Sequence, residues 1–223
     1  MNRTILNNQT LATSDNTVFV TVAAYPDHES VTAALRKTAE DHGVPIVFYD
    51  VGEPWQGFYH HKIEKMHEHM KHFRDAGKQF AFFFDSRDVV FIDPLDTILA
   101  KLNAIYDGRV IFSHDMPGKI WPSHNDHLLM AIEHAMQSEH ARIAAGTCAG
   151  EIETIMKILQ AAIEIRRELK EGRPRPGVLS HLYREIGERH CDDDQHLCQI
   201  CMAYYPELFR LDYDKELLVL CQN

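Results

Sequence analysis

The first 113 residues alternate between short apolar runs and amphipathic segments, and few folds accommodate this order. The runs are rich in Val, Ile and Phe, which favours buried strands, and the segments between them carry apolar side chains at helical spacing. We therefore predict an α/β fold: a Rossmann-type, mostly parallel sheet with helices on both faces. The predicted strands are residues 17–24, 44–49, 79–84 and 109–113. The predicted helices between them are residues 30–42, 58–76 and 94–102.

The remaining half of the chain is less regular and mainly helical in pattern. Residues 1–16 are predicted to be a flexible N-terminal lead, and residues 17–223 a single domain. Helices are predicted at residues 128–136, 151–170, 179–187 and 193–204, and short strands at 142–146, 207–211 and 217–220.

Composition and charge argue against several classes of protein. The net charge is −10 with no long basic run, so nucleic-acid binding is not expected. Residues 60–74 are locally basic, but interleaved Glu favours a solvated amphipathic helix over a DNA footprint. No segment approaches the roughly 20 apolar residues that span a bilayer, so no membrane contact is expected. The start lacks a signal-peptide pattern and the five Cys are an odd number, which favours reduced thiols and a cytoplasmic location.

The strongest local signal is the acidic turn Asp85-Ser86-Arg87-Asp88, which directly follows the Phe-rich run at residues 79–84. In a parallel sheet, ligands bind at the carboxyl ends of the strands, where Asp85 is expected to lie. Two carboxylates three residues apart can face one hard cation, and Mg²⁺ or Mn²⁺ prefers such oxygen ligands. The alternative is structural: one of these aspartates caps the turn and pairs with Arg87.

Several segments, taken in order, resemble the glycosyltransferase domain of procollagen lysyl hydroxylases. The similarity extends over about residues 17–223, and the order and spacing of its motifs are more specific than any single motif. It implies a GT-A fold, a UDP-sugar donor and Mn²⁺ (or Mg²⁺). The segments that carry the resemblance are residues 19–57, Lys62, 84–90, 110–122, 192–195 and 211–223.

The resemblance also assigns roles to individual residues. It places Val22 in the nucleotide pocket, Lys62 on the donor and Trp121 beside the sugar. It makes Asp85 and Asp88 the metal ligands, with Asp85 also near the ribose. The pair Asp193 and Asp194 would face the acceptor and carry the catalytic role. A lysine suits phosphate as a point charge, and an aromatic wall suits the apolar face of a sugar.

The chain departs from the family pattern at three places. Tyr213 stands where the family has a metal-binding His, and a phenol is a poorer ligand for Mn²⁺ than imidazole. The metal would then be held more weakly, be supplemented by Asp212 or Asp214, or be absent. The family's LNSGG segment is replaced by IAAGT at residues 143–147, and the family's glycine-containing tail would continue past Asn223.

The aspartates at residues 192–194 permit a structural and a functional interpretation, and His114 is a further candidate site residue. Residues 192–194 precede a helical pattern, so their carboxylates could cap that helix or one of them could act as a catalytic base. His114 follows a predicted strand, and we consider it as a contact to the donor sugar or to the acceptor.

A cluster of Cys and His residues supports a different class of function. Five such residues fall within twelve positions, and the CxxC spacing at Cys198 and Cys201 occurs in zinc sites. The same two thiols lie on the apolar side of a predicted helix, where free cysteines often pack. The members of this cluster are His190, Cys191, His196, Cys198 and Cys201.

The sequence thus favours one function and leaves two others open. The favoured function is transfer of glucose or galactose from a UDP-sugar to an unidentified hydroxyl acceptor. The first alternative is a degenerate GT-A-like domain that binds a nucleotide-sugar without transferring it. The second is a zinc-stabilised interaction module built on residues 190–201. The oligomeric state is not indicated by any feature of the sequence.

Overall fold

A computed structural model of the chain describes residues 10–114, 133, 142–173, 175–177, 180 and 191–218. Several predictions lie wholly or partly outside these residues. They are most of the lead at 1–16, Trp121, the helices at 128–136 and 179–187, His190, and the end of the strand at 217–220.

The described elements follow the predicted alternation of strands and helices. The strands are β1 (Thr17–Val22), β2 (Ile46–Tyr49), β3 (Phe80–Phe84), β4 (Val110–His114), β5 (Ile143–Glu151) and β6 (Phe209–Asp212). The helices are α1 (His28–Val31), α2 (Ala33–Asp41), the π-helix η1 (His60–Lys65), α3 (Met66–Asp75), α4 (Leu95–Ile105), α6 (Ile152–Lys170), α8 (Asp194–Tyr204) and the 3₁₀ turn η4 (Pro206–Leu208).

The strands form one sheet in the order β2-β1-β3-β5-β4-β6. The pairs β1–β2, β1–β3 and β4–β6 are parallel, whereas β5 runs antiparallel between β3 and β4. The predicted α/β fold with a mostly parallel sheet is therefore confirmed. β5 is longer than the strand predicted at 142–146, because pairing on both sides keeps its small residues extended despite their weak strand propensity.

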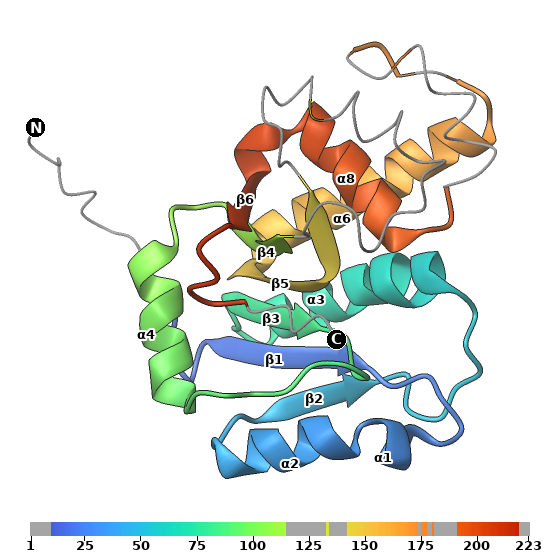
Figure 1. The fold of residues 1–223 in the computed structure, drawn as a ribbon. Helices are drawn as coiled ribbons and strands as arrows, with labels where there is room; N and C mark the ends of the chain where they lie inside the picture. Colours follow the sequence, from blue (N-terminus) through green and yellow to red (C-terminus); the bar gives the residue numbers. More distant parts are fainter. Residues whose placement is uncertain are drawn as a thin grey trace, which may run out of the picture.

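Helices cover both faces of this sheet, as predicted (Figure 1). Along β3, Phe80, Phe82 and Phe84 point into the core shared with α2 and α4. Ala81 and Phe83 point into the larger core shared with α3, α6 and α8. This alternation follows from the two-residue period of a strand, and it explains why the run is apolar at every position.

The strands other than β5 all point the same way, so their carboxyl ends meet at one edge of the sheet. Asp85 follows β3 there, His114 ends β4, and Tyr213 follows β6. The hydroxyl of Thr21, near the end of β1, donates a hydrogen bond of 2.5 Å to the carbonyl of Phe84. This bond holds the end of β3 in place immediately before the acidic turn.

Candidate active site

Asp85 is held at the edge of the sheet by the antiparallel strand β5. Its backbone N–H donates to the carbonyl of Gly146 at 2.8 Å. A Cβ added to Gly146 would lie 2.7 Å from Oδ2 of Asp85, closer than real Cβ atoms approach. Glycine is therefore required at position 146 if the carboxylate is to keep this position. Within the IAAGT segment, this is the residue on which the site depends.

Lys62 provides the positive charge at the centre of the site. Its side chain is 8% exposed, and its Nζ lies 2.5 Å from Oδ1 of Asp85 and 3.2 Å from Oδ2 of Asp194. Burial alone would lower the pKa of Lys62, but the Asp194 and Asp85 carboxylates outweigh burial and raise the pKa. The ammonium is therefore charged. Phe83 and Cys198 line the same small cavity as Lys62, so the charges interact beside an apolar wall.

The helix that carries Lys62 becomes a π-helix, η1, two residues after its start at Phe58, where the sequence predicted a regular helix over 58–76. In a π-helix one residue more fits into each turn, and such turns are frequent at functional sites. Lys62 lies within η1, and α3 continues the helix from Met66. The local departure from α-helical geometry thus occurs where the buried cation is presented to Asp85.

The Asp85 carboxylate lies in surroundings that disfavour its charged form, chiefly because it is buried. Burial raises the pKa of Asp85; Lys62 lowers it in part, and the Asp194 and Asp88 carboxylates add to the rise. A group whose charged form is disfavoured in this way gains from a further nearby cation. The position therefore suits a bound metal ion electrostatically.

The two aspartates predicted to be catalytic have different surroundings. Asp193 is the N-cap of α8, because its Oδ1 accepts hydrogen bonds from the backbone N–H of His196 at 2.9 Å and from its ring nitrogen at 2.8 Å. Asp194 is buried and faces Lys62. The structural and the functional interpretation therefore apply to two neighbouring residues. Asp193 caps the helix, and Asp194 reaches the site. Their catalytic roles stay predictions.

The other residues of the acidic turn differ in their exposure to solvent. Asp88 is exposed, and Ser86 is buried with an Oγ that has no hydrogen-bond partner among the described residues. Arg87 does not pair with its acidic neighbours in the way the structural alternative suggested; its guanidinium lies over the ring of Tyr25, 4.3 Å from the ring centre.

A third protein ligand for a metal is not found among the described residues. They contain no group of three or more His, Cys, Asp and Glu side chains placed to hold an ion. Tyr213 is 49% exposed, and its ring centre lies 4.8 Å from that of His114. Asp85 and Asp88 stay the predicted metal ligands.

Asp212 does not supplement these ligands, as the sequence analysis had allowed. Its carboxylate is buried and accepts hydrogen bonds from the backbone N–H groups of Glu216, Leu217 and Leu218 at 2.7–3.0 Å. The same three bonds hold residues 216–218 in a turn, so the strand predicted at 217–220 does not begin there. Asp212 stabilises the backbone after β6.

Val22, predicted to contact the nucleotide, has a buried side chain. Val22 ends β1, is 1% exposed and belongs to the core on the α3 and α6 side of the sheet. The structure therefore shows a packing role, and contact with a nucleotide stays a prediction. Trp121 lies outside the described residues.

Three aromatic residues that the sequence analysis did not single out lie beside the site. Tyr25, Trp55 and Phe58, here called the aromatic row, come from the turn after β1, the loop after β2 and the first turn of the helix that contains η1. Trp55 and Phe58 flank Gly57 in the segment that separates β2 from the Lys62 helix. The only local signal for them in the sequence is an aromatic-rich segment between a predicted strand and a predicted helix, because their proximity to Lys62 depends on the fold.

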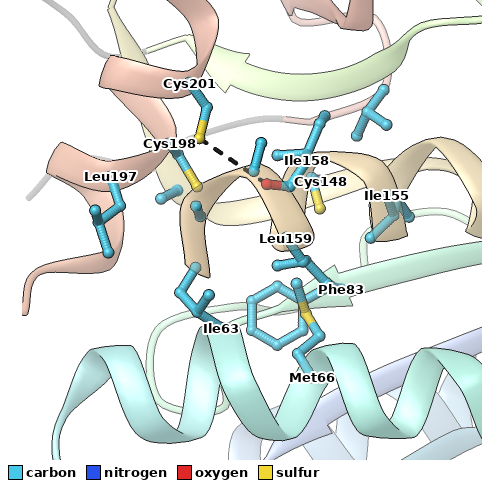
Figure 2. Close-up of a cluster of buried hydrophobic side chains, with 14 of the residues drawn as sticks. Ile63, Met66, Phe83, Cys148, Ile155, Ile158, Leu159, Leu197, Cys198 and Cys201 are labelled. Carbon is cyan, nitrogen blue, oxygen red and sulfur yellow. Dashed lines mark hydrogen bonds between the residues drawn. The ribbon is translucent and has the colours of Figure 1, made fainter. Parts of the chain in front are cut away.

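The cysteine cluster packs in the core and does not form a metal site among the described residues (Figure 2). The thiol of Cys201 donates to the carbonyl of Ile158 at 3.9 Å, and Cys198 lies in the same apolar cluster. Burial raises the pKa of the Cys148 and Cys201 thiols to about 12 and raises that of Cys198 well above its ordinary value. The structure therefore favours protonated, packed thiols; His190 is outside the described residues.

Comparison with known families shows to which family the chain belongs. The profile of a family described as the PLOD GT domain matches residues 13–168. The match covers more than half of the chain and includes Lys62, Asp85 and Asp88. The chain belongs to this family. A search of curated proteins found no match.

Membership of the PLOD GT family confirms the resemblance drawn from the sequence motifs and supports a glycosyltransferase function. Such a domain uses a nucleotide-sugar donor and an acceptor, and its family is consistent with the GT-A-like sheet seen here. Asp194 and Tyr213 lie beyond the matched residues, so their placement rests on the structure. None of the described helices is long and apolar enough to cross a membrane.

Proposed function

We propose that this chain transfers a hexose, glucose or galactose, from a UDP-sugar to a hydroxyl group of an acceptor. One observation carries the proposal: in a member of the PLOD GT family, a buried lysine lies between two carboxylates at the carboxyl edge of the sheet. Parallel sheets bind their ligands at this edge. A buried ammonium held there is a ready partner for the diphosphate of a nucleotide-sugar.

The two carboxylates of the acidic turn fit a divalent ion. Burial disfavours the charged form of Asp85, which a bound cation would stabilise, and the missing side chain of Gly146 leaves room at its Oδ2. Mg²⁺ and Mn²⁺ commonly bind to one or two carboxylates and complete their shell with substrate phosphates and water. Asp85 and Asp88 would hold such an ion. When bound, it would neutralise the charge that develops on the departing diphosphate.

The other residues of the site bind, orient and accept protons. Lys62 holds the diphosphate and is itself fixed by Asp85 and Asp194. Asp194 presents a second carboxylate to Lys62, 3.2 Å from its Nζ, which would accept the proton of an acceptor hydroxyl. Asp193 keeps α8 in place and so sets the position of Asp194.

A binding domain without transfer activity is the second candidate. Tyr213 favours it, since it replaces the imidazole that the family resemblance predicts, and it lies exposed beside His114. With two carboxylates as the metal ligands, the domain could hold a nucleotide-sugar without activating it. Detection of UDP binding with no release of UDP from any donor would establish this candidate.

The proposal is tested by measuring the release of UDP from UDP-glucose and UDP-galactose with Mn²⁺ present. We expect turnover by the wild type, and a loss of more than about tenfold in the Lys62→Met variant because the diphosphate loses its counter-charge. Lys101→Met is the matched control: Lys101 forms a similar pair, 2.6 Å from Asp93, on the surface. Equal activity of Lys62→Met and Lys101→Met would overturn the proposed role of the site.

A further inference from the structure

The aromatic row forms a continuous set of contacts around the site. The rings of Tyr25 and Trp55 stack with centres 5.9 Å apart and planes 19° apart. Phe58 meets Trp55 edge-on, with centres 5.3 Å apart and planes at 80°. Both ends of the row reach the charged residues: Arg87 of the acidic turn lies over Tyr25, and the Nζ of Lys62 lies 5.1 Å from the centre of the Phe58 ring.

Two of the three rings are already stacked within the protein. Tyr25 stacks with Trp55 and carries the guanidinium of Arg87. Trp55 stacks with Tyr25 and also with the imidazole of His61, whose centre lies 4.9 Å away with planes 19° apart. These contacts make Tyr25 and Trp55 a rigid support. No ring in the described part of the chain stacks on Phe58.

Phe58 is the exposed member of the row. Phe58 is 46% exposed. The next residue, Tyr59, is buried, and the guanidinium carbon of Arg166 lies 3.6 Å from the centre of its ring. Gly57, with a φ of 106°, turns the chain immediately before Phe58. Phe58 therefore offers an accessible apolar ring beside the buried ammonium of Lys62, where a ligand held by that lysine would meet it.

The chemistry of a nucleotide-sugar matches this arrangement. A diphosphate held by Lys62 leaves the attached hexose within the reach of neighbouring groups. The C–H face of a hexose is apolar, and aromatic side chains commonly form the walls of pockets for such ligands. Within the described part of the chain, Phe58 combines a ring centre 5.1 Å from the Nζ of Lys62 with an exposed surface.

We infer that Phe58 contacts the hexose of the donor and makes the site prefer a glycosylated nucleotide over free UDP. The inference rests on the proposed function and adds a specificity-determining residue to it. Because Tyr25 and Trp55 are stacked on protein groups, the preference is assigned to Phe58 and not to the row as a whole.

The test is calorimetric titration of UDP, UDP-glucose and UDP-galactose into the wild type and the Phe58→Ala variant. The variant should bind at least one UDP-hexose about five- to tenfold more weakly and free UDP as the wild type does, since a ring contact of this kind contributes on that order. Phe58→Leu, which keeps apolar volume without a ring, should behave like Phe58→Ala. Phe58→Tyr should restore wild-type binding.

Leu11→Ala is the matched control, because Leu11 is also a large exposed apolar residue, 59% exposed, and lies outside the aromatic row. The inference would be overturned if Phe58→Ala and Phe58→Leu kept the wild-type ratio of UDP-hexose affinity to UDP affinity. Equal losses of affinity for UDP and both UDP-hexoses are one such result. Absence of UDP binding by the wild type would instead overturn the proposed function, so the two failures are distinguishable.

Discussion

Gly146 approaches Asp85 so closely that a Cβ on the glycine would lie 2.7 Å from the Oδ2 of the carboxylate. The contact joins the antiparallel strand β5 to the end of β3 and couples the fold to the site. It predicts that Gly146→Ala pushes the Asp85 carboxylate away from its position beside Lys62. We expect binding of UDP with Mn²⁺ to weaken by more than about tenfold, as measured by calorimetry.

Gly150→Ala provides the comparison for this prediction. A Cβ at position 150 would lie 3.1 Å from the backbone of Val110, so this variant also crowds β5, but away from Asp85. Both substitutions should lower the free energy of unfolding by about 1–3 kcal/mol. Weakened ligand binding in Gly150→Ala as well as in Gly146→Ala would show that crowding of β5, and not displacement of Asp85, is responsible.

His61 connects the loop of the aromatic row to the helix that carries Lys62. Its ring is fully buried; Nε2 accepts from the N–H of Gln56 at 3.1 Å, so Nδ1 carries the proton and donates to Asp50 at 2.8 Å. Removal of the ring leaves the buried Asp50 carboxylate without this donor. We expect His61→Ala to lower the free energy of unfolding by about 2–3 kcal/mol in urea titrations.

The neighbouring His60 offers a control for His61. It pairs with Glu64 one turn along the helix at 3.1 Å, with both side chains partly exposed. Such pairs contribute little, so His60→Ala should change the free energy of unfolding by less than about 0.5 kcal/mol. A similar loss in both variants would contradict the role given to the buried His61–Asp50 pair.

The two neighbouring aspartates at the start of α8 should separate into a catalytic and a structural residue. Asp194→Asn should lower the rate of sugar transfer by roughly a hundredfold if Asp194 receives the acceptor proton. Asp193→Asn should retain most activity, since asparagine also caps helices well. Equal loss of activity in both variants, with both folded, would contradict this division.

Asp193 also predicts a dependence of stability on pH. Burial alone would raise its pKa, but the hydrogen bonds from His196 outweigh burial and lower the pKa below the ordinary value of 3.8. A carboxyl with a lower pKa in the folded state stabilises the fold above that ordinary value, and the stabilisation is lost as the pH falls below it. The difference in unfolding free energy between the wild type and Asp193→Asn should therefore shrink below about pH 4. A difference that grows in acid would contradict this.

The buried thiols should be unreactive in the folded protein. The pKa of Cys148 and Cys201 is about 12, so few of these thiols are ionised at neutral pH. Alkylation by iodoacetamide requires the thiolate. At about pH 8 we expect labelling of both residues, followed by mass spectrometry, to be more than about a hundredfold slower than in urea. Fast labelling in the folded state would show that these cysteines are accessible.

Local sequence features predicted the parts of the fold that depend on local chemistry. The Phe-rich run at 79–84 and the aspartate after it identified β3 and the position of Asp85, since apolar content and turn residues act over a few positions. The long antiparallel β5 was not predicted, because its pairing with β3 and β4 is decided by residues far away in the chain. The requirement for Gly146 follows from the same long-range pairing.

The candidate site, like the fold, could be predicted from the sequence only in part. A run of three aspartates before a helix predicts a helix cap and a catalytic group. The sequence does not say which aspartate caps the helix and which one is catalytic. The structure separates them through Lys62, which lies 3.2 Å from Asp194 and comes from another helix. Phe58 was not identified because a single aromatic residue gains meaning only when its neighbours, Trp55 and Lys62, are known.

The central claim is that Asp85 and Asp88, with Lys62, form a metal-assisted site for a UDP-sugar. The most direct test is calorimetric titration of UDP, with and without Mn²⁺, into the wild type and the Asp85→Ala/Asp88→Ala variant. We predict UDP binding that is strengthened by Mn²⁺ in the wild type, and loss of that strengthening in the variant. No binding of UDP to the wild type under either condition would contradict the claim and leave this chain with the family's fold alone.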